Sequence, residues 1–180
     1  MKIIAFVGMP CSGKTEAVQI AKEMGVPVIR MGDMVWDEVK KRGLPLDEKN
    51  VGAIADQMRR DLGMDIWAKR TLDKILLLEK TIRIIIDGIR NIEEIDTFKK
   101  KLGKDFIIIA VFASDEIRQK RFLYRGREDD SSDIQDLKDR DKRELSWGLG
   151  TVIASADIVV PNEDGIDEFR EVIRKILNKI

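Results

Sequence analysis

The chain has 180 residues, enough for one domain with a sizeable core, and its 33 lysines and arginines are balanced by 33 aspartates and glutamates. It has no histidine and a single cysteine, Cys11, which excludes a Ser-His-Asp triad, a disulfide framework and an ordinary zinc site. The zero net charge also argues against a protein whose main partner is nucleic acid.

Short apolar runs alternate with longer helical patterns along the chain. We expect β-strands at residues 2–7, 26–29, 81–87, 105–112 and 157–160. We expect helices at residues 14–24, 64–79 and 91–102, from residue 114 onward, and at 164–178. The β-branched runs are typical of strands buried on both faces. The alternation therefore predicts an α/β fold with a doubly wound, five-stranded parallel sheet.

The sequence has no repeat and no linker rich in Pro, Gly or Ser, so we expect one domain spanning residues 1–180. Residues 32–63 and 126–149 do not fit a minimal strand–helix unit, and they follow strands where ligand-facing insertions normally lie. No apolar run approaches the roughly 20 residues of a membrane span, so we expect a cytoplasmic protein without a membrane partner. Its abundant isoleucine, lysine and glutamate are typical of a thermophile.

The turn after the first expected strand matches the phosphate-binding pattern G-x-x-x-x-G-K-[ST]. Such a loop wraps a phosphate with its backbone N–H groups, and the following helix adds its positive dipole. Lysine reaches the β- and γ-phosphates, and the threonine hydroxyl is a magnesium ligand. The expected nucleotide-binding residues here are Gly8, Met9, Pro10, Cys11, Ser12, Gly13, Lys14 and Thr15. Cys11 is either a small packed side chain or a redox group.

Further segments make the chain resemble adenylate kinase and the nucleoside monophosphate kinases. Residues 31–35, Met-Gly-Asp-Met-Val, resemble the segment that begins the acceptor-binding helices of that family. Residues 87–90, Asp-Gly-Ile-Arg, are similar to its Asp-Gly-Phe-Pro-Arg motif, shortened by one residue. Residues 121–127 resemble the arginine pair at the entry to the lid and residues 127–130 its exit, which implies a short lid. Residues 156–162 instead resemble dephospho-CoA kinase.

The resemblance implies an enzyme that transfers the γ-phosphate of ATP to a nucleoside monophosphate, with AMP as the expected acceptor and Mg²⁺ bound with ATP. It implies catalytic roles for Lys14, Arg90, Arg125 and Arg140, with Arg143 as an alternative to Arg140. Three arginines are implied over the donor nucleotide: Arg121, Arg125 and Arg127. The magnesium ligands are implied to be Thr15 and Asp87. Transfer between two phosphates needs positioning and positive charge, which suits a chain without histidine.

The implied acceptor-binding residues are Asp33, Trp36, Arg59, Arg90 and Glu94. Each of these except Arg90 also has a structural interpretation. Asp33 suits a helix N-cap, Trp36 a core position, Arg59 an exposed helix face, and Glu94 a capping box with Asn91. The family has an arginine where Trp36 stands and a glutamine near Glu94, so phosphoryl transfer is better supported than AMP as the acceptor.

Other assignments also have alternatives. Asp87 is either a magnesium ligand or a cap of the next element, and the basic residues of 118–127 are either functional or a solvated face paired with the acids of 128–141.

Two rival functions remain open at this point. The first keeps the fold but has a hydroxyl acceptor, as in dephospho-CoA kinase, with Asp33 or Asp87 as the general base. The second is a nucleotide-dependent switch or assembly factor, in which residues 32–63 and 126–149 form partner surfaces.

Overall fold

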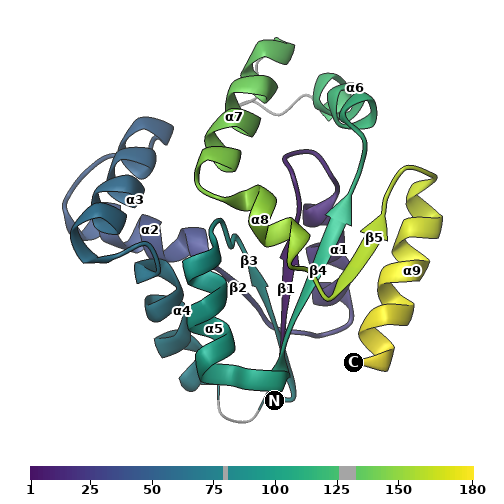
Figure 1. Ribbon diagram of the computed structural model, residues 1–180, viewed down its shortest axis with the longest axis horizontal. Helices are drawn as coiled ribbons and strands as arrows, with labels where there is room; N and C mark the ends of the chain where they lie inside the picture. Colours follow the sequence, from purple (N-terminus) through teal and green to yellow (C-terminus); the bar gives the residue numbers. More distant parts are fainter. Residues whose placement is uncertain (79–80, 126–132) are drawn as a thin grey trace.

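A computed structural model describes residues 1–78, 81–125 and 133–180, without the side chains of Glu48 and Arg125 (Figure 1). Within these residues the strands form one sheet whose neighbouring strands are parallel, in the order β2-β3-β1-β4-β5. The strands are β1 Lys2–Val7, β2 Val28–Arg30, β3 Arg83–Asp87, β4 Phe106–Phe112 and β5 Ile158–Pro161. The predicted α/β fold with a doubly wound five-stranded parallel sheet is therefore confirmed.

Helices cover both faces of this sheet. They are α1 Lys14–Glu23, α2 Met31–Lys41, α3 Glu48–Leu62, α4 Ile66–Leu76, α5 Ile92–Leu102, α6 Asp115–Arg125, α7 Ile134–Ser146, α8 Leu149–Ala154 and α9 Ile166–Lys179, with a 3₁₀ turn, η1, at Gly103–Asp105. On β1, Ile3 and Ala5 pack into a core with α4, α5 and α8, whereas Ile4 and Phe6 pack into a second core with α1 and α9. Strand side chains that alternate between two apolar layers explain the continuous β-branched runs.

The expected strands are all present, and β2 shows what fixes a strand end. The prediction began this strand at residue 26, but the ladder begins at Val28. The N–H of Val26 donates to the carbonyl of Ala21 and closes the end of α1, where Gly25 has a φ of 75°. Pro27 has no N–H to donate, so it pairs with β3 only through its carbonyl oxygen, which accepts the N–H of Ile85 at 2.8 Å.

The helices agree less closely with the sequence pattern. The helix expected at residues 64–79 is α4, and residues 79–80 lie outside the described part of the chain. The capping box is confirmed, because the side chain of Asn91 accepts a hydrogen bond from the N–H of Glu94 at 2.8 Å. The short helix α8 was not predicted. It begins after Gly148, whose φ of 104° turns the chain away from α7.

The strands carry the functional segments at their carboxyl ends. In Figure 1 the loop after β1 and the helices α6 and α7 lie at the upper end of the sheet, while α2 and α3 lie to the left of it. A ligand of a parallel α/β sheet binds at this edge, where the strand order reverses around β1. Among the described residues, no helix is long and apolar enough to cross a membrane.

Candidate functional site

The loop between β1 and α1 has the backbone of a phosphate cradle. Gly8 has a φ of 151°, and a Cβ there would stand 2.4 Å from the carbonyl oxygen of Val111. Gly13 has a φ of 109°, and a Cβ there would stand 2.0 Å from Nδ2 of Asn162. Cys11 is in the left-handed region with a φ of 60°, which is uncommon for a residue other than glycine. Alternating backbone conformations of this kind turn successive N–H groups toward an anion.

Two side chains hold the outside of this loop. The carbonyl oxygen of Ser12 accepts hydrogen bonds from Nδ2 of Asn162 at 2.8 Å and from Nη1 of Arg121 at 3.2 Å. Arg121 also donates to the carbonyl oxygen of Asn162 at 2.8 Å. A carbonyl held in this way cannot turn toward a bound phosphate, which it would repel. The buried Ser12 Oγ has no hydrogen-bond partner among the described residues.

Arg118 ties the same loop to the helices above it. Its guanidinium donates to the carbonyl oxygen of Pro10 at 3.1 Å and makes a two-pronged ion pair with Asp141 of α7 at 2.9 and 2.6 Å. It also bonds to Asp115 at 2.8 Å. Because Arg118 is only 6% exposed, its interpretation as part of a solvated basic face is wrong. No spacing in the sequence reveals a pair of residues that only the fold brings together.

Charged side chains from several segments act on Lys14. Burial lowers the pKa of Lys14 to about 8, and the positive charges of Arg90 and Arg140 act in the same direction. The carboxylates of Glu144 and Asp87 act in the opposite direction. The first turn of α1, the end of β3, the turn before α5 and helix α7 therefore contribute charges to one place. Lys14, Arg90, Arg140 and Asp87 were expected in the site, whereas Glu144 was not.

A cleft of about 960 Å³ opens beside these charges. Four of the expected acceptor-binding residues line it: Trp36, Arg59, Arg90 and Glu94. Two further arginines of α7, Arg140 and Arg143, also line it. Apolar and small residues of α2, α3 and the segment between them complete one wall, namely Met31, Gly32, Val35, Leu46, Val51, Gly52 and Ala55. The cleft thus combines an apolar wall with charged groups of both signs, because five further acids also line it, namely Asp47, Asp56, Asp136, Asp139 and Glu144.

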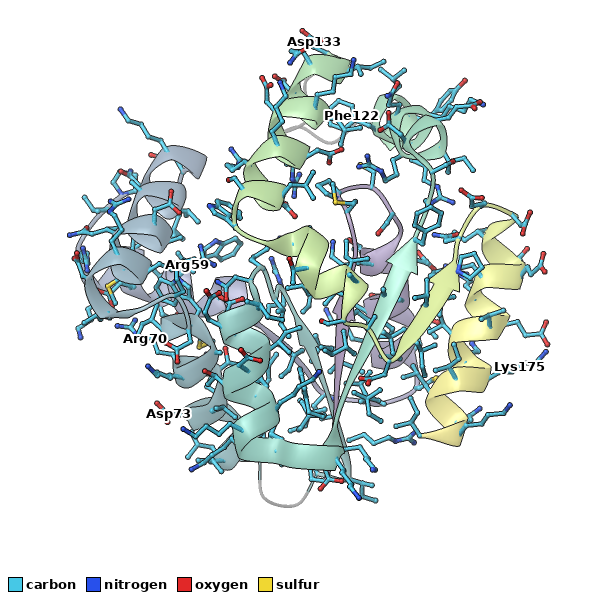
Figure 2. All side chains as sticks on the ribbon, in the orientation of Figure 1. Arg59, Arg70, Asp73, Phe122, Asp133 and Lys175 are labelled. Atoms are coloured by element: carbon cyan, nitrogen blue, oxygen red, sulfur yellow. The ribbon has the colours of Figure 1, made fainter. Side chains whose placement is uncertain are left out.

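Arg59 and Glu94 form a buried ion pair in the wall of this cleft. Nη2 of Arg59 lies 3.3 Å from Oε1 of Glu94, and Oε2 of Glu94 accepts the backbone N–H of Arg90 at 2.7 Å. Burial raises the pKa of Glu94, while the charge of Arg59 opposes that rise. Nε of Arg59 has no hydrogen-bond partner among the described residues. Figure 2 shows Arg59 between α3 and the upper end of α5.

The ring of Trp147 makes cation–π contacts with two of the arginines. The guanidinium of Arg59 lies 5.4 Å from its ring centroid and that of Arg143 lies 5.9 Å away, both within cation–π range. Phe122, between α6 and α7 in Figure 2, also lines the cleft. Trp147 is not among the residues expected in the site, because it follows α7 in a segment dominated by charge.

The structural interpretations of three expected site residues are wrong. Asp33 lies in the first turn of α2, whose N-cap is Arg30, so Asp33 does not cap this helix. Asp33 pairs with Arg30 at 3.9 Å and is not among the described residues that line the cleft. Trp36 is 39% exposed and is not a core residue. Arg59 is 8% exposed and is not on a solvated face.

The structure places the remaining expected site residues only in part. Asp87 ends β3, and the cap of α5 is Asn91, so Asp87 does not cap that helix. Glu94 has the expected capping contact in addition to its place in the cleft wall. The side chain of Arg125 and all of residues 126–132, including Arg127 and the expected exit of the lid, lie outside the described residues.

The donors available for a cation are hydroxyl and carboxylate oxygens. Thr15 is exposed at the first turn of α1, and the charge of Asp87 reaches the neighbouring Lys14. The described residues contain no group of three or more acidic or cysteine side chains able to hold a metal by themselves. This donor set fits Mg²⁺ bound together with nucleotide phosphates, because Mg²⁺ prefers oxygen and is often held by one or two protein groups plus phosphate.

Comparison with known proteins identifies the family of this chain. A protein-family model described as an AAA domain matches residues 7–138. A UPF0200 protein of Methanosarcina barkeri is 44% identical over 178 residues, covering 99% of this chain and 95% of the relative. The chain belongs to the UPF0200 family. A UPF0200/UPF0201 protein of Archaeoglobus fulgidus is 46% identical over the whole chain, which spans 56% of the length of that relative.

Solved structures resemble the UPF0200 chain in fold. TT1252 from Thermus thermophilus aligns with a TM-score of 0.68 at 14% identity, covering 99% of this chain and 97% of that one. A shikimate kinase from Acinetobacter baumannii in complex with shikimate aligns at 0.58 and 15% identity, covering 99% and 92%. A gluconokinase from Sinorhizobium meliloti aligns at 0.56 and 14% identity, with the same coverage. The fold is therefore that of P-loop kinases, and at these identities the likeness extends to the fold alone.

Proposed function

We propose that this UPF0200 protein is an ATP-dependent phosphotransferase that moves the γ-phosphate to the phosphate of a nucleoside monophosphate, with AMP as the preferred acceptor. The observation that carries the proposal is the position of Arg90. Its charge acts on Lys14 of the phosphate loop, and its side chain lines the cleft beside that loop. An arginine that lines the cleft and lies within electrostatic reach of this lysine is suited to hold an acceptor phosphate near the transferred group.

The donor side of the proposal is the loop of residues 8–15. Its N–H groups and the start of α1 receive the β- and γ-phosphates, and Lys14 adds a positive charge. Magnesium, held by Thr15 and Asp87 when bound, supplies charge that offsets the charge of the phosphates. Arg118, Arg121 and Asn162 keep the carbonyl oxygens of Pro10 and Ser12 on the outside of the loop.

The acceptor side of the proposal is the cleft. Arg90 binds the acceptor phosphate, Arg140 lies on α7 within electrostatic reach of Lys14, and the apolar wall with Trp36 receives the base. The acceptor phosphate oxygen is itself the nucleophile, so the residues need only orient it and exclude water. Arg125 and Arg127, whose side chains lie outside the described part of the chain, are proposed to bind the donor phosphates.

A hydroxyl acceptor is the second candidate, favoured by the carboxylate of Asp87 beside Lys14. A hydroxyl must lose its proton to attack phosphorus, and Asp87 at the end of β3 is the group placed to take it. The fold match to a shikimate kinase and a gluconokinase, two kinases named for small molecules, agrees with this candidate as well as with the first. The arginines that line the cleft favour the first candidate, because an acceptor phosphate needs cationic partners and a hydroxyl group by itself does not.

One assay separates these candidates. ADP formation is measured with ATP and Mg²⁺ plus AMP, GMP, CMP or UMP, and in parallel with shikimate, gluconate or dephospho-CoA. The proposal expects a monophosphate to raise the rate well above hydrolysis without acceptor, and AMP to do so most. Stimulation only by a hydroxyl compound would replace the first candidate with the second. Slow hydrolysis that no acceptor changes would favour a nucleotide-dependent switch.

A further inference from the structure

Glu144 lies between two arginines of the cleft. Its Oε2 accepts a hydrogen bond from Nη1 of Arg90 at 2.7 Å, and its Oε1 accepts one from Nε of Arg140 at 3.4 Å. The side chain of Glu144 is 4% exposed, whereas those of Arg90 and Arg140 are 22% and 41% exposed. The carboxylate is thus shielded from water, while the arginines that hold it are open to the cleft.

This arrangement is also one that recognises a phosphate. Guanidinium groups bind carboxylates and phosphates through the same planar set of N–H donors. Glu144 takes one N–H from each guanidinium, which has five. The position is close enough to the phosphate loop for the charge of Glu144 to act on Lys14. A phosphate bound for transfer would therefore accept hydrogen bonds from the same N–H groups of Arg90 and Arg140 that now bind Glu144.

We propose that Glu144 occupies an anion subsite formed by Arg90 and Arg140, and that a phosphate group of the substrate exchanges with it there. This rests on the proposed function, because it takes the phosphate of that reaction as the exchanging anion. No covalent bond forms or breaks in the exchange. The guanidinium hydrogen bonds pass from carboxylate oxygens to phosphate oxygens, and Glu144 then repels the newly bound anion.

The exchange has a consequence for α7. Glu144 and Arg140 both belong to α7, whereas Arg90 lies in the turn between β3 and α5. The ion pair between Glu144 and Arg90 therefore joins α7 to the sheet. When phosphate takes Arg90, this link is released, and α7 remains attached through Arg118 and Asp141. Glu144 is thus a positioning residue that competes with substrate, and it is not a catalytic residue.

The competition predicts that removing the charge of Glu144 strengthens phosphate binding. The test titrates inorganic phosphate by calorimetry into protein saturated with ADP and Mg²⁺, so that the phosphate loop is already filled. Glu144→Gln is expected to bind phosphate about tenfold more tightly than the wild type, because a nearby like charge is removed while the size of the side chain is kept. A purely structural role predicts equal or weaker binding, and that result would overturn the proposal.

The matched control is Asp73→Asn. Asp73 is an exposed residue of α4 and loses the same charge, but it does not line the cleft. Its affinity for phosphate is expected to change by at most about twofold, because a more distant exposed charge is screened. An equal gain in both variants would attribute the effect to net charge and overturn the proposal.

A second variant covers the case in which Glu144→Gln does not fold. Glu144→Asp keeps the charge but shortens the side chain by one methylene, so its hold on Arg90 weakens. Its phosphate affinity is expected to lie between those of the wild type and Glu144→Gln. An affinity at or below that of the wild type would contradict the exchange.

The outcome is separate from that of the proposed function. If the wild type transfers phosphate to a monophosphate and neither Glu144 variant gains phosphate affinity, the exchange alone is wrong. If the Glu144 variants gain affinity for phosphate, but neither they nor the wild type transfer phosphate to a monophosphate, the exchange stands and the proposed reaction is wrong.

Discussion

The side-chain amide of Asn162 donates a hydrogen bond to the backbone carbonyl of Ser12 at 2.8 Å, although 150 residues separate them along the chain. Asn162 follows β5, and its own N–H donates to the carbonyl oxygen of Phe112 at 2.7 Å. The last strand therefore fixes the outer side of the phosphate loop. The buried position of Asn162, only 6% exposed, makes this contact a constraint on the conformation of the loop.

Gly13→Ala is expected to disrupt the loop by clashing with this amide. The new Cβ would stand 2.0 Å from Nδ2 of Asn162, and the φ of 109° disfavours any side chain. We expect ATP affinity to fall by at least about tenfold, because the cradle must shift away from its phosphate-binding shape. The measurement is ATP binding by calorimetry, alongside thermal unfolding.

Two variants separate the clash from backbone strain. Gly25→Ala also places a side chain at a positive φ, 75°, but no atom lies within 4 Å of the new Cβ. It is expected to lower stability without changing ATP affinity. The double variant Gly13→Ala with Asn162→Ala removes the clashing amide and is expected to recover part of the affinity. No recovery in the double variant would show that the contact does not shape the loop.

Arg118→Met is expected to destabilise the protein by about 3–5 kcal/mol, because it leaves the carboxylate of Asp141 largely buried without its partner. The pair spans α6 and α7 and its arginine side chain is 7% exposed. Denaturant unfolding measures the change. The double variant Arg118→Met with Asp141→Leu is expected to regain part of the loss. A single variant within about 0.5 kcal/mol of the wild type would match a surface pair and contradict this account.

The sheet and the phosphate loop could be predicted from sequence because their signals are local. Continuous β-branched runs mark strands buried on both faces, and the spacing from Gly8 to Thr15 defines the loop. The position of Arg90 could be predicted for a related reason, since it follows the end of β3 and strand ends meet at one edge of a parallel sheet.

The rest of the site depends on contacts between distant segments. Helical spacing places Arg59 on an exposed face of α3, and only the packing of α5 and Trp147 against it makes it buried. In the sequence, Glu144 is one acid in a charged stretch. Only the fold brings it to Arg90, which is 54 residues away along the chain. A pattern within one helix cannot reveal what another helix will cover.

Glu38 links α2 to α4 and gives the stability a dependence on pH. It accepts hydrogen bonds from Arg42 at 2.8 Å and from Arg70 of α4 at 2.9 Å. These arginines hold the pKa of Glu38 below its usual value. The stabilisation is therefore fully present above the unfolded pKa of about 4.5 and is lost as pH falls through the lower folded pKa.

Glu38→Gln is expected to cost about 1.5–3 kcal/mol at pH 7, the range for hydrogen bonds to a charged group. The difference from the wild type should shrink as the pH falls below about 4.5, where the wild type also loses the charge. Urea unfolding at a series of pH values measures this. A difference that stays constant with pH would assign the loss to packing.

Arg90→Met is expected to separate acceptor binding from donor binding. Loss of the guanidinium should lower kcat/KM for the monophosphate by at least about 100-fold, because a charge-assisted contact to the acceptor phosphate is lost. The Kd for ATP should change by no more than a few fold. A larger effect on ATP than on the acceptor would place Arg90 on the donor side. Arg60→Met, at an exposed position of α3, is the control.

The most direct test of the account follows the phosphate itself. Protein, Mg²⁺ and ATP labelled at the γ-phosphate are mixed with AMP in a single turnover, and the labelled products are separated. The account predicts that the label appears in ADP formed from AMP, with little in inorganic phosphate, and that Lys14→Met abolishes this transfer. Label that appears only in inorganic phosphate, at a rate unchanged by AMP or any other monophosphate, would contradict it.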